Sequence, residues 1–180
     1  MNPQPTVISS ILFVCMGNIC RSPAGENVMR RLLEEAGLAD GIRCDSAGTI
    51  DYHTGSPPDS RMHAAGRQRD LPMTGSARQV TRADLDTFDL ILAMDDDNHV
   101  ELLKLATHRN RHKIKRFCTY CIKHTDREVP DPYYGGPEGF EHVLNLLEDG
   151  CQQILQEIRH SHGIYAGIKI PASLIQERSD

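Results

Sequence analysis

Apolar and polar positions along this chain follow two periods, one typical of strands and the other of helices. Almost wholly apolar runs at 7–14 and 89–94 indicate strands buried on both faces. Elsewhere apolar residues recur every three or four positions, which places them on one face of a helix. The two periods predict helices over 23–37, 59–69, 96–107 and 138–160 and shorter strands over 42–47 and 113–117.

Strands and helices alternate along the chain, with turn residues between them. Pro23 suits the first turn of a helix and Gly37 suits a helix end. The segments 48–58 and 118–136 are predicted to be loops. Alternation of this kind is typical of βαβ units, so we expect an α/β fold with a parallel sheet and helices on both faces. In such folds ligands bind at the carboxyl ends of the strands.

The composition is that of a globular domain. The chain has 180 residues, of which 39% are apolar and 25% charged, enough for a sizeable core. We expect one domain over 6–160 and an extension over 161–180, where 163–175 either docks on the core or has no catalytic role. The formal net charge of −5 argues against general binding of nucleic acid or anionic membranes, because both require a basic surface.

The chain shows neither of the two common signals for a membrane or for export. No apolar run approaches the roughly 18 residues of a membrane helix, and 1–5 lacks the basic start of a signal peptide. We therefore expect no membrane partner and a cytoplasmic location. In that compartment the six cysteines are expected to be free thiols rather than three disulfides.

The loop after the first strand has the features of a phosphate-binding cradle. It runs from Cys15 to Ser22 and includes Arg21. Phosphate-monoester transfer needs a nucleophile, donors for the phosphoryl oxygens and an acid for the leaving group. Backbone N–H groups at a helix N-terminus stabilise both a thiolate and a bound anion, and an arginine binds two phosphoryl oxygens at once.

The Cys-x5-Arg spacing is weak support by itself, because the chain contains it twice. The second match, from Cys121 to Arg127, has no glycine and carries Asp126, and neither a long apolar strand nor a helix pattern flanks it. The first match follows a buried strand, contains Gly17 and Asn18, and has no acidic residue. Glycine permits tight curvature and asparagine tolerates left-handed conformations. We interpret the second match as a coincidence.

Several further segments occur in a recognisable order. They are 15–23, 45–49, 55–59, 76–79, 88–95 and 129–136. In residues and spacing they resemble the low-molecular-weight protein tyrosine phosphatases, over roughly 7–160. The resemblance implies a three-layer α/β/α fold with a central four-stranded parallel sheet. It also implies hydrolysis of phosphotyrosine or other aryl phosphate monoesters through a phosphocysteine intermediate, with no cofactor and no metal.

The resemblance assigns catalytic roles to three residues: Cys15 is the nucleophile, Arg21 clamps the phosphate and Asp131 is the general acid. Without the resemblance, Asp131 before Pro132 would be read only as a turn starter. The remaining residues of the phosphate-binding loop are Met16, Gly17, Asn18, Ile19, Cys20 and Ser22.

The resemblance also implies supporting roles around the loop. Asn18 and Ser46 match residues that hold the loop in shape, and Ser22 matches the hydroxyl that hydrogen-bonds the thiolate. Ser22 is also a candidate helix N-cap, in place of that role or together with it. Asp95 follows a buried strand, and we expect it to cap a helix or brace the loop.

Specificity and regulation are expected at the cleft. Tyr133 and Tyr134 resemble one aromatic wall and Tyr52 the other, although packing by partly buried tyrosines is the alternative. A slot between aromatic walls favours a phenyl phosphate over phosphoserine. Cys20 matches a cysteine that forms a reversible disulfide with the nucleophile, which would shield Cys15 from irreversible oxidation; the alternative is a small buried residue.

Two other clusters have structural interpretations. Cys118 and Cys121 have the spacing of half a zinc site, but His124 alone cannot complete a tetrahedral set, so we expect no metal. The basic segment 108–116 is expected to be a solvated turn, with docking of an acidic partner as the alternative.

Two other functions remain open. An arsenate reductase on the same fold would share the cradle, although the strand ending at Met94 is followed by Asp95 rather than by the cysteine of a relay. An inactive phosphate-binding adaptor would be expected to lose Cys15, Arg21 or Asp131. We expect a monomer whose partner is a phosphotyrosine-containing protein, such as a tyrosine kinase.

Overall fold

A four-stranded parallel sheet forms the centre of the molecule. The computed structural model describes residues 7–165 and 168–169. The strands are β1 (Ser10–Cys15), β2 (Arg43–Gly48), β3 (Leu90–Ala93) and β4 (Ile114–Arg116), and their order in the sheet is β2-β1-β3-β4. The central four-stranded parallel sheet that the resemblance implied is therefore confirmed.

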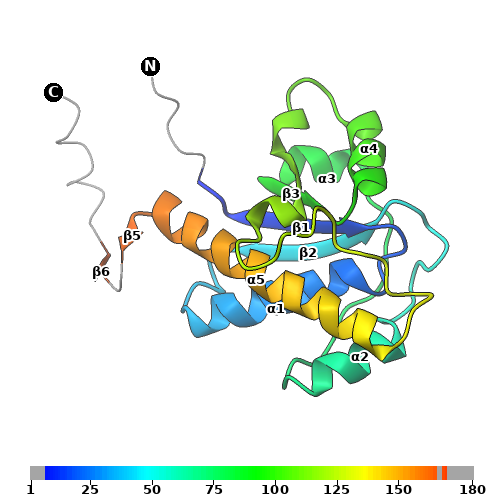
Figure 1. Ribbon diagram of the computed structural model, residues 1–180. Helices are drawn as coiled ribbons and strands as arrows, with labels where there is room; N and C mark the ends of the chain where they lie inside the picture. Colours follow the sequence, from blue (N-terminus) through cyan, green and yellow to red (C-terminus); the bar gives the residue numbers. More distant parts are fainter. Residues whose placement is uncertain (1–6, 166–167, 170–180) are drawn as a thin grey trace, which may run out of the picture.

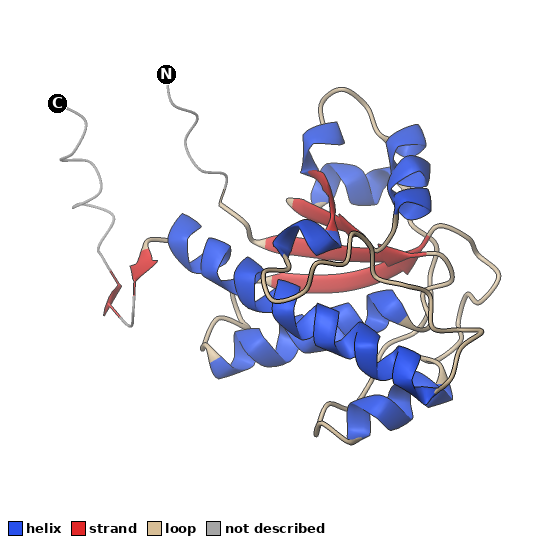
Figure 2. Cartoon of the chain, in the orientation of Figure 1, coloured by secondary structure: helices blue, strands red, loops and turns tan. Residues whose placement is uncertain are grey.

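Helices cover both faces of this sheet (Figures 1 and 2). They are α1 (Arg21–Glu35), α2 (Ser60–Arg67), α3 (Arg82–Thr87), α4 (Asp96–Leu105) and α5 (Pro137–Ser161), with 3-10 turns η1 (Arg111–Lys113) and η2 (Phe117–Tyr120). Helices α1, α2 and α5 lie on one face, and α3 and α4 lie on the other. The fold is thus the expected three-layer α/β/α arrangement.

The alternation of side chains along β1 divides the interior into two cores. Ile11 and Phe13 point to the core shared with α1 and α5, whereas Leu12 and Val14 point to the core shared with α3 and α4. Successive side chains of a strand face opposite sides of the sheet, so a strand covered on both faces must be apolar throughout. This is why the first apolar run shows no polar alternation.

Gly37 ends α1 as the sequence predicts. Its φ is +67°, a conformation that glycine adopts without strain. The Leu38 N–H donates to Leu33 O at 2.8 Å and the Gly37 N–H donates to Glu34 O at 3.0 Å. These two bonds satisfy carbonyl groups that the end of a helix otherwise leaves without partners.

The observed bounds differ from the predicted ones at several ends. The first strand begins at Ser10 rather than at residue 7, and β4 is shortened because η1 and η2 flank it. Asp59 caps α2 from outside, accepting a hydrogen bond from the Arg61 N–H. Helix α3 was not predicted, since it has only six residues and only one of them, Leu85, is a buried apolar residue.

The C-terminal segment contains a short strand pair that was not predicted. β5 (Ile164–Tyr165) and β6 (Ile168–Lys169) pair antiparallel, at the end of α5 and apart from the main sheet (Figure 1). The prediction that 163–175 either docks on the core or has no catalytic role falls mostly outside the described residues. Among the described helices, none has the length and apolar character needed to span a membrane.

Candidate active site

The cradle lies at the carboxyl edge of the sheet, between β1 and α1. Cys15 is the last residue of β1, and α1 begins at Arg21. The N-cap residue is Cys20, which supplies no side-chain hydrogen bond, and the first turn of α1 has no acidic residue. The first backbone N–H groups of α1 and the positive end of its dipole are therefore directed toward the loop.

Asn18 makes the sharp turn within the loop. Its φ is +55°, which confirms the predicted left-handed conformation. Its N–H donates to Cys15 Sγ at 3.3 Å. Gly17, by contrast, does not have a positive φ; a Cβ there would lie 2.9 Å from Cδ2 of His53. The glycine is thus explained by the close approach of the His53 ring rather than by curvature.

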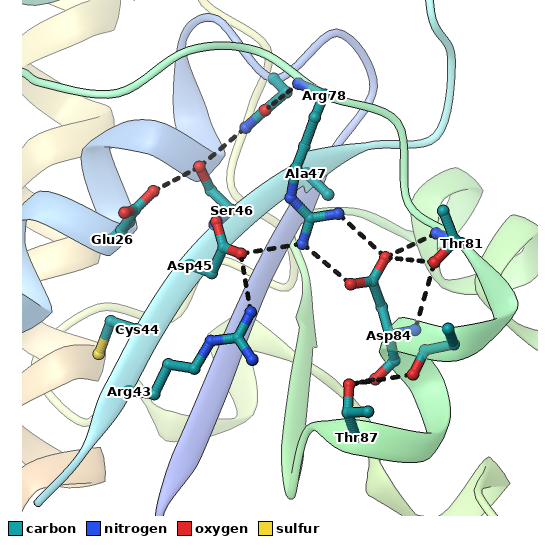
Figure 3. Close-up of polar contacts among 12 residues, drawn as sticks. Glu26, Arg43, Cys44, Asp45, Ser46, Ala47, Arg78, Thr81, Asp84 and Thr87 are labelled. Atoms are coloured by element: carbon teal, nitrogen blue, oxygen red, sulfur yellow. Dashed lines mark hydrogen bonds and ion pairs between the residues drawn. The ribbon is translucent and has the colours of Figure 1, made fainter.

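The Asn18 side chain connects the loop to β2 and to the segment before α3. Its Nδ2 donates to Ser22 Oγ and to Ser46 Oγ, both at 2.9 Å. Its Oδ1 accepts from the Arg78 N–H at 2.9 Å. The Arg78 guanidinium in turn bonds Asp45 and Asp84 (Figure 3). The side-chain amide is therefore held at three points.

Ser22 lies beside the candidate nucleophile. Its Oγ is 3.0 Å from Cys15 Sγ and also lies 3.3 Å from Ala47 O. The hydroxyl accepts from Asn18 Nδ2, and its one hydrogen faces both Ala47 O and Cys15 Sγ. It can donate to the sulfur when Cys15 is a thiolate. The alternative role of Ser22 as N-cap was wrong, because the helix already begins at Arg21.

Glu26 extends this network and was missed in the sequence. The Ser46 hydroxyl donates to Glu26 Oε2 at 2.6 Å, and Arg30 pairs with Oε1 at 2.7 Å. Burial raises the pKa of Glu26, although the bonds from Ser46 and Arg30 act in the opposite direction. Figure 3 shows Glu26 and Ser46 pointing toward each other from α1 and β2. A single glutamate within an amphipathic helix gives no signal of such a contact.

The Arg21 side chain is buried and is held by three partners. It is 2% exposed; Nη1 pairs with Asp95 at 2.5 Å and donates to Val129 O at 3.0 Å, and Nη2 pairs with Asp131 at 3.2 Å. Burial disfavours its charge, but the negative charges of Cys15, Asp95 and Asp131 outweigh burial and raise the pKa of Arg21. Asp95 also accepts from the Asn98 N–H at 2.7 Å, which confirms it as a helix cap.

A cleft of about 370 Å³ opens above the cradle. Its lining residues are Cys15, Met16, Gly17, Ile19, Cys20, Arg21, Ile50, Tyr52, His53, Asp131, Tyr133 and Tyr134. Tyr133 and Tyr134 meet edge to face with their ring centroids 5.0 Å apart. The structure therefore brings the three predicted tyrosines and Asp131 to the same cleft as Cys15. Ile50 and His53 were not predicted, although they flank Tyr52 in the loop.

Ser46 and Asp95 do not line this cleft. They lie behind it and contact Asn18 and Arg21, in keeping with the supporting positions expected for them. Cys20 is buried, and this burial, with the negative charge of Asp59 as the next cause, raises the pKa of its thiol.

Cys118 and Cys121 do not line the cleft. A hydrogen bond between the two side chains raises the pKa of Cys118, and His124 pairs with Asp149 at 3.2 Å. Within residues 7–165 and 168–169, no group of three or more potential metal ligands occurs.

The backbone of the second Cys-x5-Arg segment binds a carboxylate of the protein itself. The N–H groups of Ile122, Lys123 and His124 donate to Asp149 Oδ2 at 3.1, 2.8 and 3.1 Å. The backbone of this segment is therefore directed at a carboxylate of α5, and no helix follows it.

Comparisons with known proteins agree with this geometry. The family model described as low molecular weight phosphotyrosine protein phosphatase matches residues 10–163. A putative low molecular weight protein-tyrosine-phosphatase of Synechocystis sp. is 52% identical, over 82% of this chain and 95% of its own. YfkJ, a low molecular weight protein-tyrosine-phosphatase of Bacillus subtilis, is 43% identical, over 83% of this chain and 96% of its own.

A solved structure supports the same assignment. The crystal structure of a protein tyrosine phosphatase from Entamoeba histolytica, with Hepes in the active site, has a TM-score of 0.82 and 42% identity, and the match covers 84% of this chain and 97% of that one. The residues that the family model matches include the cradle, the four parallel strands and α5. This chain therefore belongs to the low-molecular-weight phosphotyrosine protein phosphatases.

Proposed function

We propose that Cys15, Arg21 and Asp131 carry out the hydrolysis of phosphotyrosine in this protein. The observation that carries the proposal is their convergence on one cleft. Cys15 and Asp131 both line it, and Arg21 Nη2 lies 3.2 Å from Asp131 Oδ2. A nucleophile, a phosphate clamp and an acid are the groups that this chemistry requires.

In the first step the Cys15 thiolate attacks phosphorus. An S–P bond forms, the bond from phosphorus to the tyrosyl oxygen breaks, and protonated Asp131 donates its proton to that oxygen. Arg21 and the backbone N–H groups of the loop bind the phosphoryl oxygens. A phosphate bound to Arg21 competes with Asp131 for the guanidinium, which frees the carboxyl group for the leaving oxygen.

In the second step the phosphocysteine is hydrolysed. Asp131, now a carboxylate, takes a proton from water as the water oxygen attacks phosphorus. The S–P bond breaks, and inorganic phosphate and the Cys15 thiolate are released. The Ser22 hydroxyl, 3.0 Å from Sγ, stabilises the departing thiolate by a hydrogen bond.

The aromatic cleft supports phosphotyrosine as the substrate group. Tyr52, Tyr133 and Tyr134 line the mouth, and their rings suit a phenyl group reaching a deep phosphate site. Family membership implies phosphotyrosine-containing proteins as substrates. A tyrosine kinase is the finer proposal for this partner, and we propose that the enzyme acts as a monomer.

We further propose a catalytic domain over 6–160, an extension over 161–180 and a cytoplasmic location. The match of the family model to residues 10–163 supports the domain. All six cysteines lie within the described residues and are free thiols, which supports a reducing compartment.

Release of phosphate from p-nitrophenyl phosphate tests the catalytic proposal. We expect activity in the wild type, none in Cys15→Ser, and a fall of kcat by about 10²- to 10⁴-fold in Asp131→Ala. Rapid quenching followed by mass spectrometry should detect the added phosphoryl group on the peptide that contains Cys15.

The same experiment separates the alternatives. An inactive adaptor would release no phosphate, and wild-type inactivity would contradict our proposal. A reductase would reduce arsenate with thioredoxin. Cys15 and Cys20 are the only cysteines among the lining residues of the cleft in the part of the chain that the structure describes, so a relay through Cys118 and Cys121 has no support in this geometry.

A further inference from the structure

Arg61 lies behind the wall of the cleft that Tyr133 forms, and it connects two segments that are distant in sequence. It is in the first turn of α2. Its Nε and Nη2 donate to the two carboxylate oxygens of Asp59 at 3.0 and 2.8 Å, and its Nη1 donates to Tyr133 O at 2.8 Å. The donors of one guanidinium are therefore divided between the N-cap residue of α2 and the segment that carries Asp131.

Aromatic rings fix the plane of the same guanidinium. Arg61 Cζ lies 4.9 Å from the centroid of the Tyr133 ring and 5.0 Å from that of Phe140. Phe140 is buried, so one of the two rings belongs to the rigid core. An arginine that lies against two rings and donates three hydrogen bonds cannot be replaced by lysine without loss of geometry.

The two residues that Arg61 bonds, Asp59 and Tyr133, are themselves hydrogen-bonded to the catalytic site. The N–H of Asp59 donates to Ile19 O, a carbonyl of the cradle, at 2.8 Å. The N–H of Tyr133 donates to Asp131 Oδ1 at 3.0 Å. Arg61 thus completes a chain of contacts that runs from the cradle to the carboxyl group of Asp131.

We propose that Arg61 is a positioning residue that holds the general acid at its distance from the cradle. The proposal rests on the proposed role of Asp131. Arg61 does not touch the phosphoryl group. It fixes the Tyr133 backbone, which in turn holds the Asp131 carboxyl group and one wall of the cleft. Misplacement of a catalytic group by a fraction of an ångström lowers its contribution severely.

The leaving group provides a readout that a merely structural role would not move. Protonation by Asp131 matters most when the leaving oxygen is strongly basic, as in phenyl phosphate, and least for p-nitrophenyl phosphate. A general weakening of the fold would lower both rates alike. We use kcat/KM because it reports the steps up to formation of the phosphocysteine, in which the leaving group departs.

We expect Arg61→Lys to lower kcat/KM for phenyl phosphate by roughly 10- to 100-fold and to lower that for p-nitrophenyl phosphate several-fold less. The inhibition constant of inorganic phosphate should stay within about twofold, because the cradle itself is intact. Arg61→Gln is the second variant, in case the lysine form folds poorly. Equal losses on both substrates in both variants would overturn the proposal.

Arg69 provides the matched control. It follows α2 and pairs with Glu141 and Glu148 of α5 at 2.6 and 3.0 Å. Arg69 therefore also joins the α2 region to the core, but its side-chain hydrogen bonds go to α5 rather than to the segment that carries Asp131. We expect Arg69→Lys to leave the ratio of the two kcat/KM values unchanged. A shift of that ratio equal to the shift in Arg61→Lys would also contradict the proposal.

A double-mutant cycle separates this proposal from the role of Asp131. If Arg61 acts through Asp131, Arg61→Lys has no further effect on the substrate ratio in the Asp131→Ala background. Additive effects would overturn the role of Arg61. If Asp131→Ala alone leaves the substrate ratio unchanged, the assignment of Asp131 as general acid fails instead.

Discussion

Asn18 and Arg21 are held in the site by side chains that are distant in the sequence. The cradle residues from Cys15 to Ser22 are consecutive, so their chemistry and spacing are visible in the sequence. The partners that hold them are not: the bonds from Asn18 to Ser46 and from Ser46 to Glu26 exist only after β2 pairs with β1. The same holds for Arg21 and Asp95, whose positions were predicted but whose ion pair was not.

Cys20 is the residue whose predicted regulatory role can be tested directly. We expect mild peroxide to join Cys15 and Cys20 in a disulfide and thiol to restore activity, whereas Cys20→Ser should lose activity irreversibly. Burial raises the pKa of the Cys20 thiol, so the bond should form faster as pH rises. Recovery of Cys20→Ser as complete as that of the wild type would contradict this role.

Mass spectrometry assigns the oxidised pair, because trypsin separates the two candidate pairs. Cys15 and Cys20 fall in the peptide that ends at Arg21, and Cys118 and Cys121 fall in the peptide 117–123. In the oxidised protein we expect the mass of the peptide that contains Cys15 and Cys20 to be lower by two hydrogen atoms. Thiol treatment should restore its original mass.

At the scale of elements, the long helices and the strands of the main sheet were predicted, whereas α3 and the 3-10 turns were not. The helices at α1, α4 and α5 have enough turns for an apolar face to appear in the sequence. Helix α3 has a capping box between Thr81 and Asp84, which is the one local signal that could have revealed it. The 3-10 turns at η1 and η2 carry no comparable periodicity.

Gly150 sets how closely α5 approaches η2. A Cβ at this position would lie 2.5 Å from two atoms of the Phe117 ring, which is fully buried. We expect Gly150→Ala to lower the free energy of unfolding by about 1–3 kcal/mol, since the core must shift to admit the methyl group.

Urea unfolding measures this effect, with Gly139→Ala as the control on the same helix. There the nearest atom to a new Cβ is 3.6 Å away, so that variant should be as stable as the wild type or slightly more stable. Equal stability of the two variants would contradict the prediction, because it would show that the Phe117 ring can move aside at no cost.

Asp149 should make the stability of α5 depend on pH. Burial disfavours its charge, but the N–H groups of Ile122, Lys123 and His124 and the His124 side chain outweigh burial and lower the pKa of Asp149. A carboxyl group with a lowered pKa stabilises the folded state above its unfolded pKa of about 3.9, and this contribution is lost as pH falls through the folded value.

We therefore expect Asp149→Asn to be less stable than the wild type at neutral pH by roughly 1–3 kcal/mol. The difference should narrow below about pH 4. Urea unfolding of both proteins across this range checks the expectation, and a difference independent of pH would contradict it.

At the scale of the molecule, the catalytic groups lie at the carboxyl edge of the sheet, away from the C-terminal end of α5. The cleft uses residues from β1, the cradle, α1, the loop that follows β2 and the segment between η2 and α5. The strand pair β5 and β6 lies beyond the C-terminal end of α5 (Figure 1). His162 Nε2 lies 2.8 Å from Ile8 O, which connects the end of α5 to the start of β1.

Truncation tests this separation. A chain ending at Gly163 should retain kcat/KM for p-nitrophenyl phosphate within about twofold, because the residues of the removed segment that the structure describes contribute nothing to the lining of the cleft. A chain ending at Ser161 also loses His162, and we expect it to unfold at lower urea with the same activity. A large loss of kcat/KM in the first chain would contradict the separation.

The three partners of Arg21 also bear on the affinity for phosphate. Asp95, Val129 and Asp131 hold the side chain in one conformation before any substrate arrives. Ordering an arginine side chain costs about 1.5–2 kcal/mol of conformational entropy. In this protein that entropy is lost when the chain folds rather than when phosphate binds, so the contact between Arg21 and the phosphoryl oxygens contributes to affinity without this entropic loss.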